Sequence, residues 1–207
     1  LMENSKNLNA DQAGISSDIV EKIDNITSTL SQEQKFWLSQ YLEGNNASST
    51  IESINNDQIL TILYGSQTGN SRSIAEELND AAKEEGIQTE LISMGKFKEK
   101  NLKKTKNLVV LVSTQGEGDP PDDALNLVDF INSSKAPKLQ STNFAVCALG
   151  DSTYEFYCKT GKDFDAKLEE LGGKRFLDRV DLDVDFDDDA EAWIRSSIAI
   201  LRLSLIH

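Results

Sequence analysis

The sequence is poor in the residues on which many active sites and disulfide scaffolds depend. Its 207 residues include one histidine, the terminal His207, which excludes a histidine general base, a histidine metal ligand and a Ser-His pair. Two cysteines are present, Cys147 and Cys158, in a chain too large to need a disulfide staple, so we expect buried free thiols. These absences exclude most hydrolases.

Long hydrophobic runs and an excess of positive charge are also missing. Residues 1–6 are polar with no apolar run after them, and no stretch approaches the roughly 20 apolar residues of a membrane span. With 35 acidic and 21 basic residues, the net charge of -14 argues against nucleic acid or an anionic membrane as the main partner. We expect a cytoplasmic, globular protein with a basic protein partner.

Residues 1–43 are predicted to form a helical hairpin that leads the chain. Apolar residues recur there at helical spacing, and Ser31 with Gln34 resembles a capping box that opens a second helix carrying Trp37. Residues 44–57, rich in Asn and Ser, are typical of a flexible linker. Two such helices cannot bury their own aromatic stripe, so the hairpin either serves assembly or folds back onto the main domain.

Residues 58–207 show the pattern of an α/β domain. Short apolar runs, typical of strands buried on both faces, occupy residues 59–64, 89–92, 107–112, 143–149 and 175–180. Amphipathic helices are predicted at residues 70–85, 124–132, 162–171 and 189–203. This alternation predicts a doubly wound, five-stranded parallel sheet with helices on both faces, in which ligands bind at the carboxyl ends of the strands.

The loop after the first strand has the chemistry of a phosphate site. Residues 65–71, with the sequence GSQTGNS, lead from a strand into a helix, where backbone amides and the helix dipole favour an anion. The loop contains no lysine and matches neither GxGxxG nor GxxxxGKS/T, so a monophosphate ester suits it better than a triphosphate or a Rossmann pyrophosphate. A capped turn with incidental Ser and Thr would be the default if this loop stood alone.

Two further loops are expected to converge on the first. Residues 113–121, with the sequence STQGEGDPP, contain glycines that permit close approach of a planar ligand. Residues 149–158, with the sequence LGDSTYEFYC, add aromatic side chains that can stack on a ring. We expect Tyr154 to be the ring partner and Phe156 to belong to the core.

The set SQTGN, STQGEGDPP and LGDSTYEFYC, in this order and after these strands, resembles the flavodoxin-like FMN domain of the diflavin reductases. Within that family, residues 133–184 and the leader sequence LSQEQKFWLSQYLEG are similar to the sulfite reductase flavoproteins. The resemblance implies that FMN is bound by Ser66, Gln67, Thr68, Gly69, Asn70, Ser71, Ser113, Thr114, Gln115, Gly116, Leu149, Gly150, Asp151, Ser152, Thr153, Tyr154, Glu155, Phe156, Tyr157 and Cys158.

The same resemblance implies an oxidoreductase that transports electrons for sulfite reduction. Electrons would arrive from an FAD and NADPH module located C-terminally in a longer chain, and would leave one at a time for the sirohaem and iron-sulfur haemoprotein subunit. The full-length flavoprotein would form a homo-oligomer through its leader helices. Because nothing in this sequence binds FAD or NADPH, this chain alone is not expected to turn over, and we assign it no catalytic residue and no metal.

Two residues of the second loop carry more specific expectations. The Gly116 carbonyl is our candidate acceptor for a hydrogen bond from the flavin N5. Gln115 stands where microsomal diflavin reductases carry an aromatic residue, which leaves Tyr154 as the stacking partner.

An acidic run lies between Asp178 and Glu191, with eight carboxylates. An EF-hand loop starting at Asp181 would need glycine and glutamate where the chain has Phe186 and Ala192, so we reject a calcium site. The run is either a solvated start of the last helix or a docking surface for basic partners. Four further acidic residues near the cofactor would extend that surface: Glu117, Asp119, Asp122 and Asp123.

Other functions stay open at this point. A free flavodoxin or the FMN domain of another diflavin reductase would use the same three loops. A receiver-like signalling module would share the fold, but it would need an aspartate at the end of strand three, where this chain has Val112, Ser113 and Thr114.

Overall fold

The structure, a computed structural model, describes residues 28–31, 34 and 58–205. The chain divides into two compact units, Leu1–Ile51 and Glu52–His207, and each is considered by itself.

In the first unit, Ser31 and Gln34 form a reciprocal pair. The Ser31 N–H donates to Gln34 Oε1 at 2.8 Å, and the Gln34 N–H donates to Ser31 Oγ at 3.2 Å. This geometry confirms the predicted capping box. The rest of the predicted hairpin and linker lies outside the described residues.

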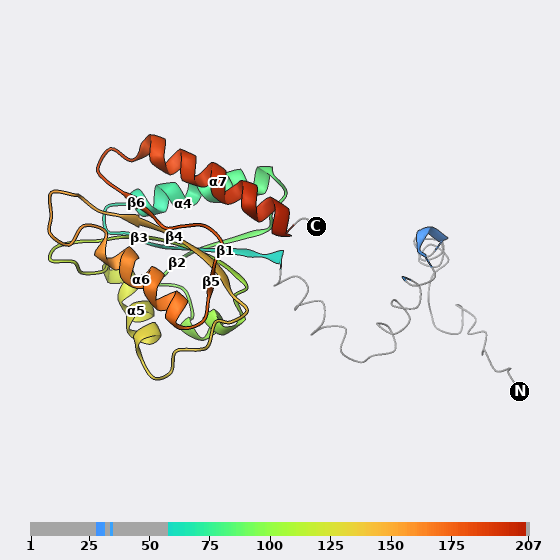
Figure 1. Cartoon of the computed structure of the whole chain (residues 1–207), viewed down its shortest axis with the longest axis horizontal. Coiled ribbons are helices and arrows are strands. Elements are labelled where there is room, and N and C mark those ends of the chain that lie inside the picture. The colour runs from blue at the N-terminus through green and yellow to red at the C-terminus, as the bar shows by residue number, and fades with distance from the viewer. Residues whose placement is uncertain (1–27, 32–33, 35–57, 206–207) are drawn as a thin grey trace, which may run out of the picture. The chain divides into compact units, whose positions relative to one another are not determined.

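The second unit is a parallel sheet between two layers of helices (Figure 1). Its strands are β1 Leu60–Gly65, β2 Thr89–Ser93, β3 Asn107–Ser113, β4 Asn143–Leu149, β5 Lys174–Arg175 and β6 Val180–Leu182. Its α-helices are α4 Asn70–Glu84, α5 Leu125–Asn132, α6 Lys159–Glu170 and α7 Asp187–Leu205, and its 3₁₀ helices are η2 Glu99–Lys104 and η3 Asp122–Ala124. The strand order is β2-β1-β3-β4-β5, with β6 also paired to β4, and every pair is parallel. The predicted doubly wound sheet is confirmed.

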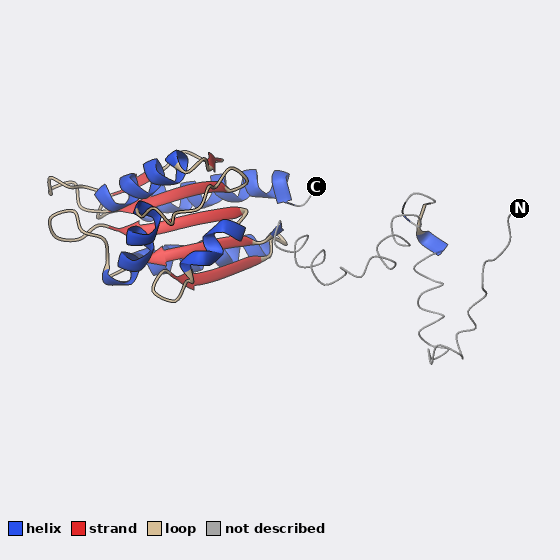
Figure 2. Cartoon of the chain, turned by 90° about the horizontal axis from the view of Figure 1, so that it is seen from below, coloured by secondary structure: helices blue, strands red, loops and turns tan. Residues whose placement is uncertain are grey.

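Alternating side chains of the central strands build two cores, one on each face of the sheet. On β3, Val109 and Leu111 pack with residues of α4 and α7, whereas Leu108, Val110 and Val112 pack with residues of α5 and α6. In Figure 1, α4 and α7 accordingly lie above the strands and α5 and α6 lie below them, and Figure 2 shows the sheet from below. Strands buried on both faces explain why the sequence shows continuous apolar runs there.

The predicted fifth strand at residues 175–180 is wrong in its extent. The structure replaces it with two short strands, β5 and β6, both paired with β4. The chain leaves the ladder after the Phe176 N–H donates to the Phe144 carbonyl at 2.9 Å. Side-chain hydrogen bonds hold the segment that follows: Arg175 and Arg179 both donate to the carboxylate of Asp165 on α6.

Several helix boundaries also differ from the prediction. Helix α6 begins at Lys159 rather than residue 162, after Cys158 adopts a left-handed conformation with φ of 55°. Helix α7 begins at Asp187, so the aspartate triplet of residues 187–189 forms its first turn. Negative charge there is stabilising because the N-terminus of a helix carries the positive end of its dipole. The 3₁₀ helix η2 was not predicted. Cys147 and Cys158 are buried free thiols, as expected.

Two classes of feature are absent from the part of the chain that the structure describes. None of its helices combines the length and apolar character that crossing a membrane requires. No three His, Cys, Asp or Glu side chains are grouped so that they could hold a metal ion.

Candidate functional site

The first loop joins the carboxyl end of β1 to the start of α4. The Gly69 N–H donates to Ser66 Oγ at 2.9 Å, which folds the loop back on itself. Gly69 has a left-handed backbone with φ of 100°, a conformation that costs a residue with a Cβ about 1–2 kcal/mol. No side chain caps α4 and its first turn contains no acidic residue. The N–H groups of that turn are therefore available to an anion.

Asp123, in the 3₁₀ helix η3 that precedes α5, fixes the position of this loop. Its Oδ1 accepts a hydrogen bond from the Ser66 N–H at 3.1 Å, and its Oδ2 accepts one from the Ser93 hydroxyl at 3.1 Å. Asp123 is half-buried. The sequence reasoning assigned Asp123 to a docking surface and missed this role. The partners are separated from it by 57 and 30 residues, and no local spacing signals such contacts.

The second loop follows β3 and closes into a tight turn. The Gln115 N–H donates to the Asp119 carbonyl at 2.9 Å, and the Asp119 N–H donates to the Gln115 carbonyl at 2.8 Å. The Gln115 side chain turns onto its own loop, where Nε2 donates to the Pro120 carbonyl at 3.1 Å. Gly116 at the tip is exposed, with φ of 50°. The turn thus presents Gly116 and holds the Gln115 side chain back.

The second and third loops are joined to each other. The Thr114 N–H donates to the Leu149 carbonyl at 2.9 Å, and Thr114 Oγ1 accepts a hydrogen bond from the Thr160 N–H at 3.0 Å. Thr114 therefore links β3, the end of β4 and the first turn of α6.

The third loop follows β4 and rests on β6. The Gly150 N–H donates to the Leu182 carbonyl at 3.0 Å, and the Tyr157 hydroxyl donates to the Asp181 carbonyl at 2.9 Å. At the start of the loop, Asp151 Oδ1 accepts from the N–H and the hydroxyl of Thr153. Both ends of the loop are thus held by main-chain groups of one short strand.

The three loops enclose a cavity of about 320 Å³ at the carboxyl ends of the strands. Its volume falls in the range of about 300–1,000 Å³ that small-molecule sites occupy. Among the described residues, twelve line it, all of them in the predicted set: Thr68, Asn70, Ser113, Thr114, Gly116, Leu149, Gly150, Asp151, Tyr154, Phe156, Tyr157 and Cys158.

The other predicted site residues lie beside the cavity rather than on its wall. They are Ser66, Gln67, Gly69, Ser71, Gln115, Ser152, Thr153 and Glu155. Ser66 and Gly69 shape the first loop, as described above. Contact of each predicted residue with a cofactor stays a prediction.

The aromatic side chains of the third loop differ in exposure. Tyr154 lines the cavity with 64% of its surface exposed, so its ring is available to a ligand. Phe156 and Tyr157 are half-buried and also line the cavity. Phe156 belongs to neither apolar core of the described residues, so the expectation that it is a core residue is wrong.

Ionisable groups beneath the third loop have shifted pKa values. Burial, and next the neighbouring Asp181, raise the pKa of the Cys158 thiol from 9.0 to about 11. Burial also raises the pKa of the Tyr157 phenol, with Cys158 as the next cause. Hydrogen bonds from the Ser152 side chain, and then from the Ser152 and Val184 N–H groups, lower the pKa of Asp183. Neither the thiol nor the phenol ionises near neutral pH, so these two groups add no charge to the cavity wall.

A cavity between three loops at the carboxyl ends of a parallel sheet is typical of flavodoxin-like proteins, and a family comparison gives the same class. The flavodoxin family model matches residues 62–193, and the chain belongs to this family. Solved structures of similar fold include oxidised flavodoxin 1 from Bacillus cereus, 25% identical with a TM-score of 0.60 over 69% of this chain and 96% of that one. A flavodoxin from Streptococcus pneumoniae TIGR4 shares the fold, with a TM-score of 0.64 at 20% identity over 70% of this chain and 99% of that chain.

Curated relatives narrow the resemblance further. The chain is 43% identical over 189 residues to the NADPH sulfite reductase flavoprotein alpha-component of Bacillus subtilis strain 168, covering 84% of this chain and 31% of that one. It is 44% identical over 195 residues to the protein of that name from Shewanella sp. strain MR-4, covering 91% and 32%. The chain thus spans about a third of the length of the curated relatives that it matches.

The residues of the site fit the cofactor FMN, which a flavodoxin domain binds. The first loop offers an uncapped helix start to a single phosphate group. The hydroxyls of Ser71 and Ser113 are buried and have no hydrogen-bond partner among the described residues. Buried hydroxyls are rarely left unpaired, and Ser113 lines the cavity at the end of β3. Tyr154 supplies an exposed ring for stacking.

Proposed function

We propose that this chain is the FMN domain of an NADPH-dependent sulfite reductase flavoprotein. In this proposal the domain accepts electrons from an FAD module that NADPH reduces, and delivers them one at a time to the sirohaem and iron-sulfur haemoprotein subunit. The observation that carries it is a three-loop cavity on a flavodoxin domain whose curated relatives are sulfite reductase flavoproteins at 43% and 44% identity.

The domain's own residues bind and orient the cofactor. FMN, when bound, supplies the electron-accepting and electron-donating chemistry. The uncapped first turn of α4 would hold the phosphate, and the exposed Tyr154 ring would be available to stack on the flavin. The Gly116 carbonyl at the exposed tip of the second loop is proposed to accept a hydrogen bond from the flavin N5.

Rapid mixing with the haemoprotein tests the proposed direction of electron flow. The FMN-loaded protein is reduced chemically, mixed without oxygen with a sulfite reductase haemoprotein, and followed at the haem absorbance. We expect haem reduction at a rate that rises with the concentration of the domain. A haem spectrum that stays oxidised, while an unrelated one-electron acceptor is reduced, would contradict the proposed partner.

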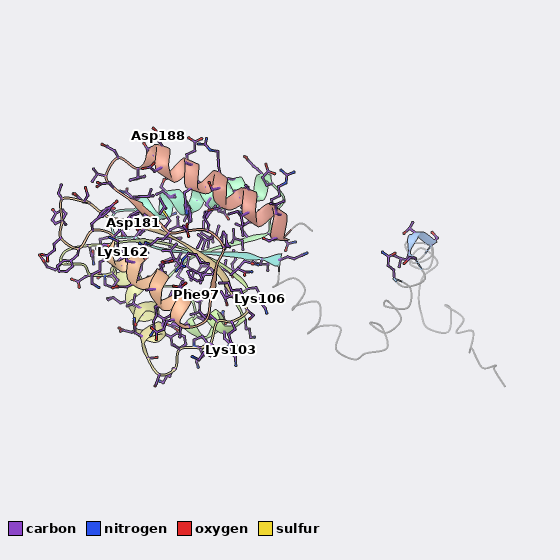
Figure 3. All side chains as sticks on the ribbon, in the orientation of Figure 1. Phe97, Lys103, Lys106, Lys162, Asp181 and Asp188 are labelled. Carbon is purple, nitrogen blue, oxygen red and sulfur yellow. The ribbon has the colours of Figure 1, made fainter. Side chains whose placement is uncertain are left out.

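We further propose that exposed carboxylates guide this encounter. Asp187, Asp188 and Asp189 are exposed in the first turn of α7, and Asp188 is labelled there in Figure 3. In contrast, Asp181 and Asp183 of the acidic run are engaged with Arg179 and Ser152. The triplet is therefore an exposed part of the run that a basic partner can reach. The prediction from sequence extends this surface to Glu117, Asp119, Asp122 and Asp123, of which Asp123 is instead engaged by Ser66 and Ser93.

Salt and charge removal test the docking surface together. The Debye screening length is about 8 Å at physiological ionic strength and shortens as salt is added. Because screening weakens the attraction between the carboxylates and a basic partner, the rate of haem reduction should fall as salt rises. Changing Asp187, Asp188 and Asp189 to Asn should slow it at low salt and flatten its salt dependence, while FMN content stays unchanged. Three substitutions at Asp80, Glu84 and Glu90 to amides serve as a control of equal charge change at exposed positions. If both sets of substitutions slow haem reduction equally, the triplet is only the solvated start of α7 and not a docking surface.

The leader of residues 1–43 is proposed to assemble the full-length flavoprotein into a homo-oligomer. The proposal rests on the aromatic stripe predicted around Trp37 and on the resemblance of the leader sequence LSQEQKFWLSQYLEG to sulfite reductase flavoproteins. Deleting residues 1–50 from the full-length subunit should lower its mass in light scattering and leave the flavin spectrum intact. An unchanged mass would refute the role in assembly.

A further inference from the structure

Arg179 joins two carboxylates that belong to different elements. Its Nη1 lies 2.9 Å from Asp165 Oδ2 on α6, and its Nε lies 2.7 Å from Asp181 Oδ1 on β6. Asp165 is 6% exposed, and a carboxylate at that depth needs charged partners. The guanidinium of Arg179 therefore attaches β6 to a helix that is itself packed on the sheet.

Strand β6 is short, and Leu182 at its end is buried in the core. It consists of three residues and pairs with β4 alone. Two hydrogen bonds join the third loop to this strand. The Leu182 carbonyl accepts a hydrogen bond from the Gly150 N–H, and the Asp181 carbonyl accepts one from the Tyr157 hydroxyl. The Cys158 thiol also donates to the Leu182 carbonyl at 3.6 Å. Any shift of β6 is thus passed to the cavity wall.

Lys162 adds a link between the same strand and the same loop. Its Nζ donates to the Tyr157 carbonyl at 2.8 Å, lies 5.1 Å from the centre of the Tyr157 ring and lies 3.7 Å from Asp181 Oδ2. Lys162 and Asp181 are labelled close together near the cavity end of the sheet in Figure 3. The contacts form a continuous path from Asp165 through Arg179 and Asp181 to Tyr157.

We propose that Arg179 is a positioning residue for FMN binding: by fixing β6 against α6 it holds Tyr157 and Cys158 in the conformation that forms the cavity wall. The inference rests on the proposed use of the third loop by FMN. Arg179 does not line the cavity, so it acts through the residues above it rather than by touching the cofactor.

Arg175 provides a matched comparison within the same network. It donates to both oxygens of Asp165, through Nε at 2.9 Å and Nη2 at 3.1 Å, and to Glu169 Oε1 at 3.0 Å. It has no side-chain hydrogen bond to β6 or to the third loop among the described residues. Removing Arg179 leaves Asp165 with the two-bond contact of Arg175, whereas removing Arg175 leaves it with one bond from Arg179.

Substitution of Arg175 is therefore expected to affect mainly the stability of the fold, and substitution of Arg179 mainly the affinity for FMN. Arg175→Gln should lower the melting temperature of the FMN-free protein more than Arg179→Gln does, because it strips more bonds from a buried carboxylate. Arg179→Gln should raise the dissociation constant of FMN by about tenfold, the loss expected for one charge-assisted contact. Arg175→Gln should leave that constant within about twofold of the unmodified protein, a change below 0.5 kcal/mol.

The experiment titrates FMN-free protein with FMN and follows quenching of flavin fluorescence, with visible circular dichroism of the bound flavin as a second readout. Arg179→Lys covers the case in which Arg179→Gln does not fold, since one ammonium can keep a single carboxylate contact, and an intermediate constant is expected. An unchanged FMN dissociation constant in the Arg179 variants, or an equal rise in the Arg175 variant, would overturn the proposal. If unmodified protein binds no FMN, the proposed site fails rather than this inference.

Discussion

The Ser66 N–H and the Asp123 carboxylate meet at 3.1 Å across 57 residues of sequence, and this contact fixes the start of the first cofactor loop. The second oxygen of the same carboxylate holds the Ser93 hydroxyl at the end of β2. One side chain of η3 thus connects the end of β2 with the first loop.

Replacing Asp123 should impair FMN binding even though Asp123 does not line the cavity. Asp123→Ala removes both acceptors and leaves the half-buried Ser66 N–H without a partner, at a cost of about 1–3 kcal/mol. Asp123→Asn keeps one acceptor oxygen and should retain most of the affinity. FMN titration of both variants measures the difference. Equal affinity of the Ala variant and the unmodified protein would show that the loop does not need this anchor.

Gly69 and Gly86 form a pair that separates backbone strain from cofactor binding. Both have left-handed φ values, 100° and 79°, and a Cβ added at either meets nothing within 4 Å. Alanine at each position should therefore destabilise the fold by a similar amount, about 1–2 kcal/mol. Gly69 lies at the start of α4 and Gly86 lies beyond its end. Only Gly69→Ala should also weaken FMN binding, as measured by titration. A loss of affinity shared by both variants would indicate general destabilisation instead.

Tyr154 should contribute to FMN affinity without contributing to folding. With 64% of its surface exposed, it packs little against the protein, so Tyr154→Ala should leave the melting temperature of the FMN-free protein unchanged. Aromatic stacking worth about 1 kcal/mol predicts a roughly fivefold rise in the dissociation constant. Tyr154→Phe keeps the ring and should bind normally. If the Ala variant binds FMN as tightly as the Phe variant, the ring is not a stacking partner.

Stability should fall in alkaline solution as buried acids ionise. The pKa of Cys158 is raised from 9.0 to about 11, so the folded state keeps a proton that the unfolded state releases above pH 9. The stability that this group contributes is complete below pH 9 and is lost as the pH rises toward 11. Tyr157 and Cys147 have raised pKa values for the same reason, burial. Urea unfolding at intervals from pH 8 to pH 11 measures the loss, and Cys158→Ala should make it shallower. A urea midpoint that does not change between pH 8 and pH 11 would contradict the raised pKa of Cys158 in the folded state.

The sequence could predict the parts of the fold that depend on local pattern. Continuous apolar runs identified β1, β3 and β4 because both faces of those strands are buried. Loop composition identified the residues that surround the cavity, since parallel strands bring their carboxyl ends to one edge of the sheet. Neither inference needed information about distant side chains.

What the sequence could not predict depends on contacts between distant residues. The apolar pair Phe176 and Leu177 continues the pattern of a strand, yet the ladder breaks there, between two arginines that both bind Asp165. The role of Asp123 was hidden for the same reason, since a carboxylate beside other acids suggests an exposed surface. Charge counts alone do not reveal which acids are engaged.

The identity and stoichiometry of the bound flavin test the central claim most directly. The protein is reconstituted with a mixture of FMN and FAD, desalted, and its flavin is extracted and separated by chromatography. We predict one FMN for each chain and no FAD, because the first loop offers one uncapped helix start to a single phosphate and the described residues that line the cavity of about 320 Å³ all belong to the three loops. Recovery of FAD, or of no flavin at all, would contradict the account.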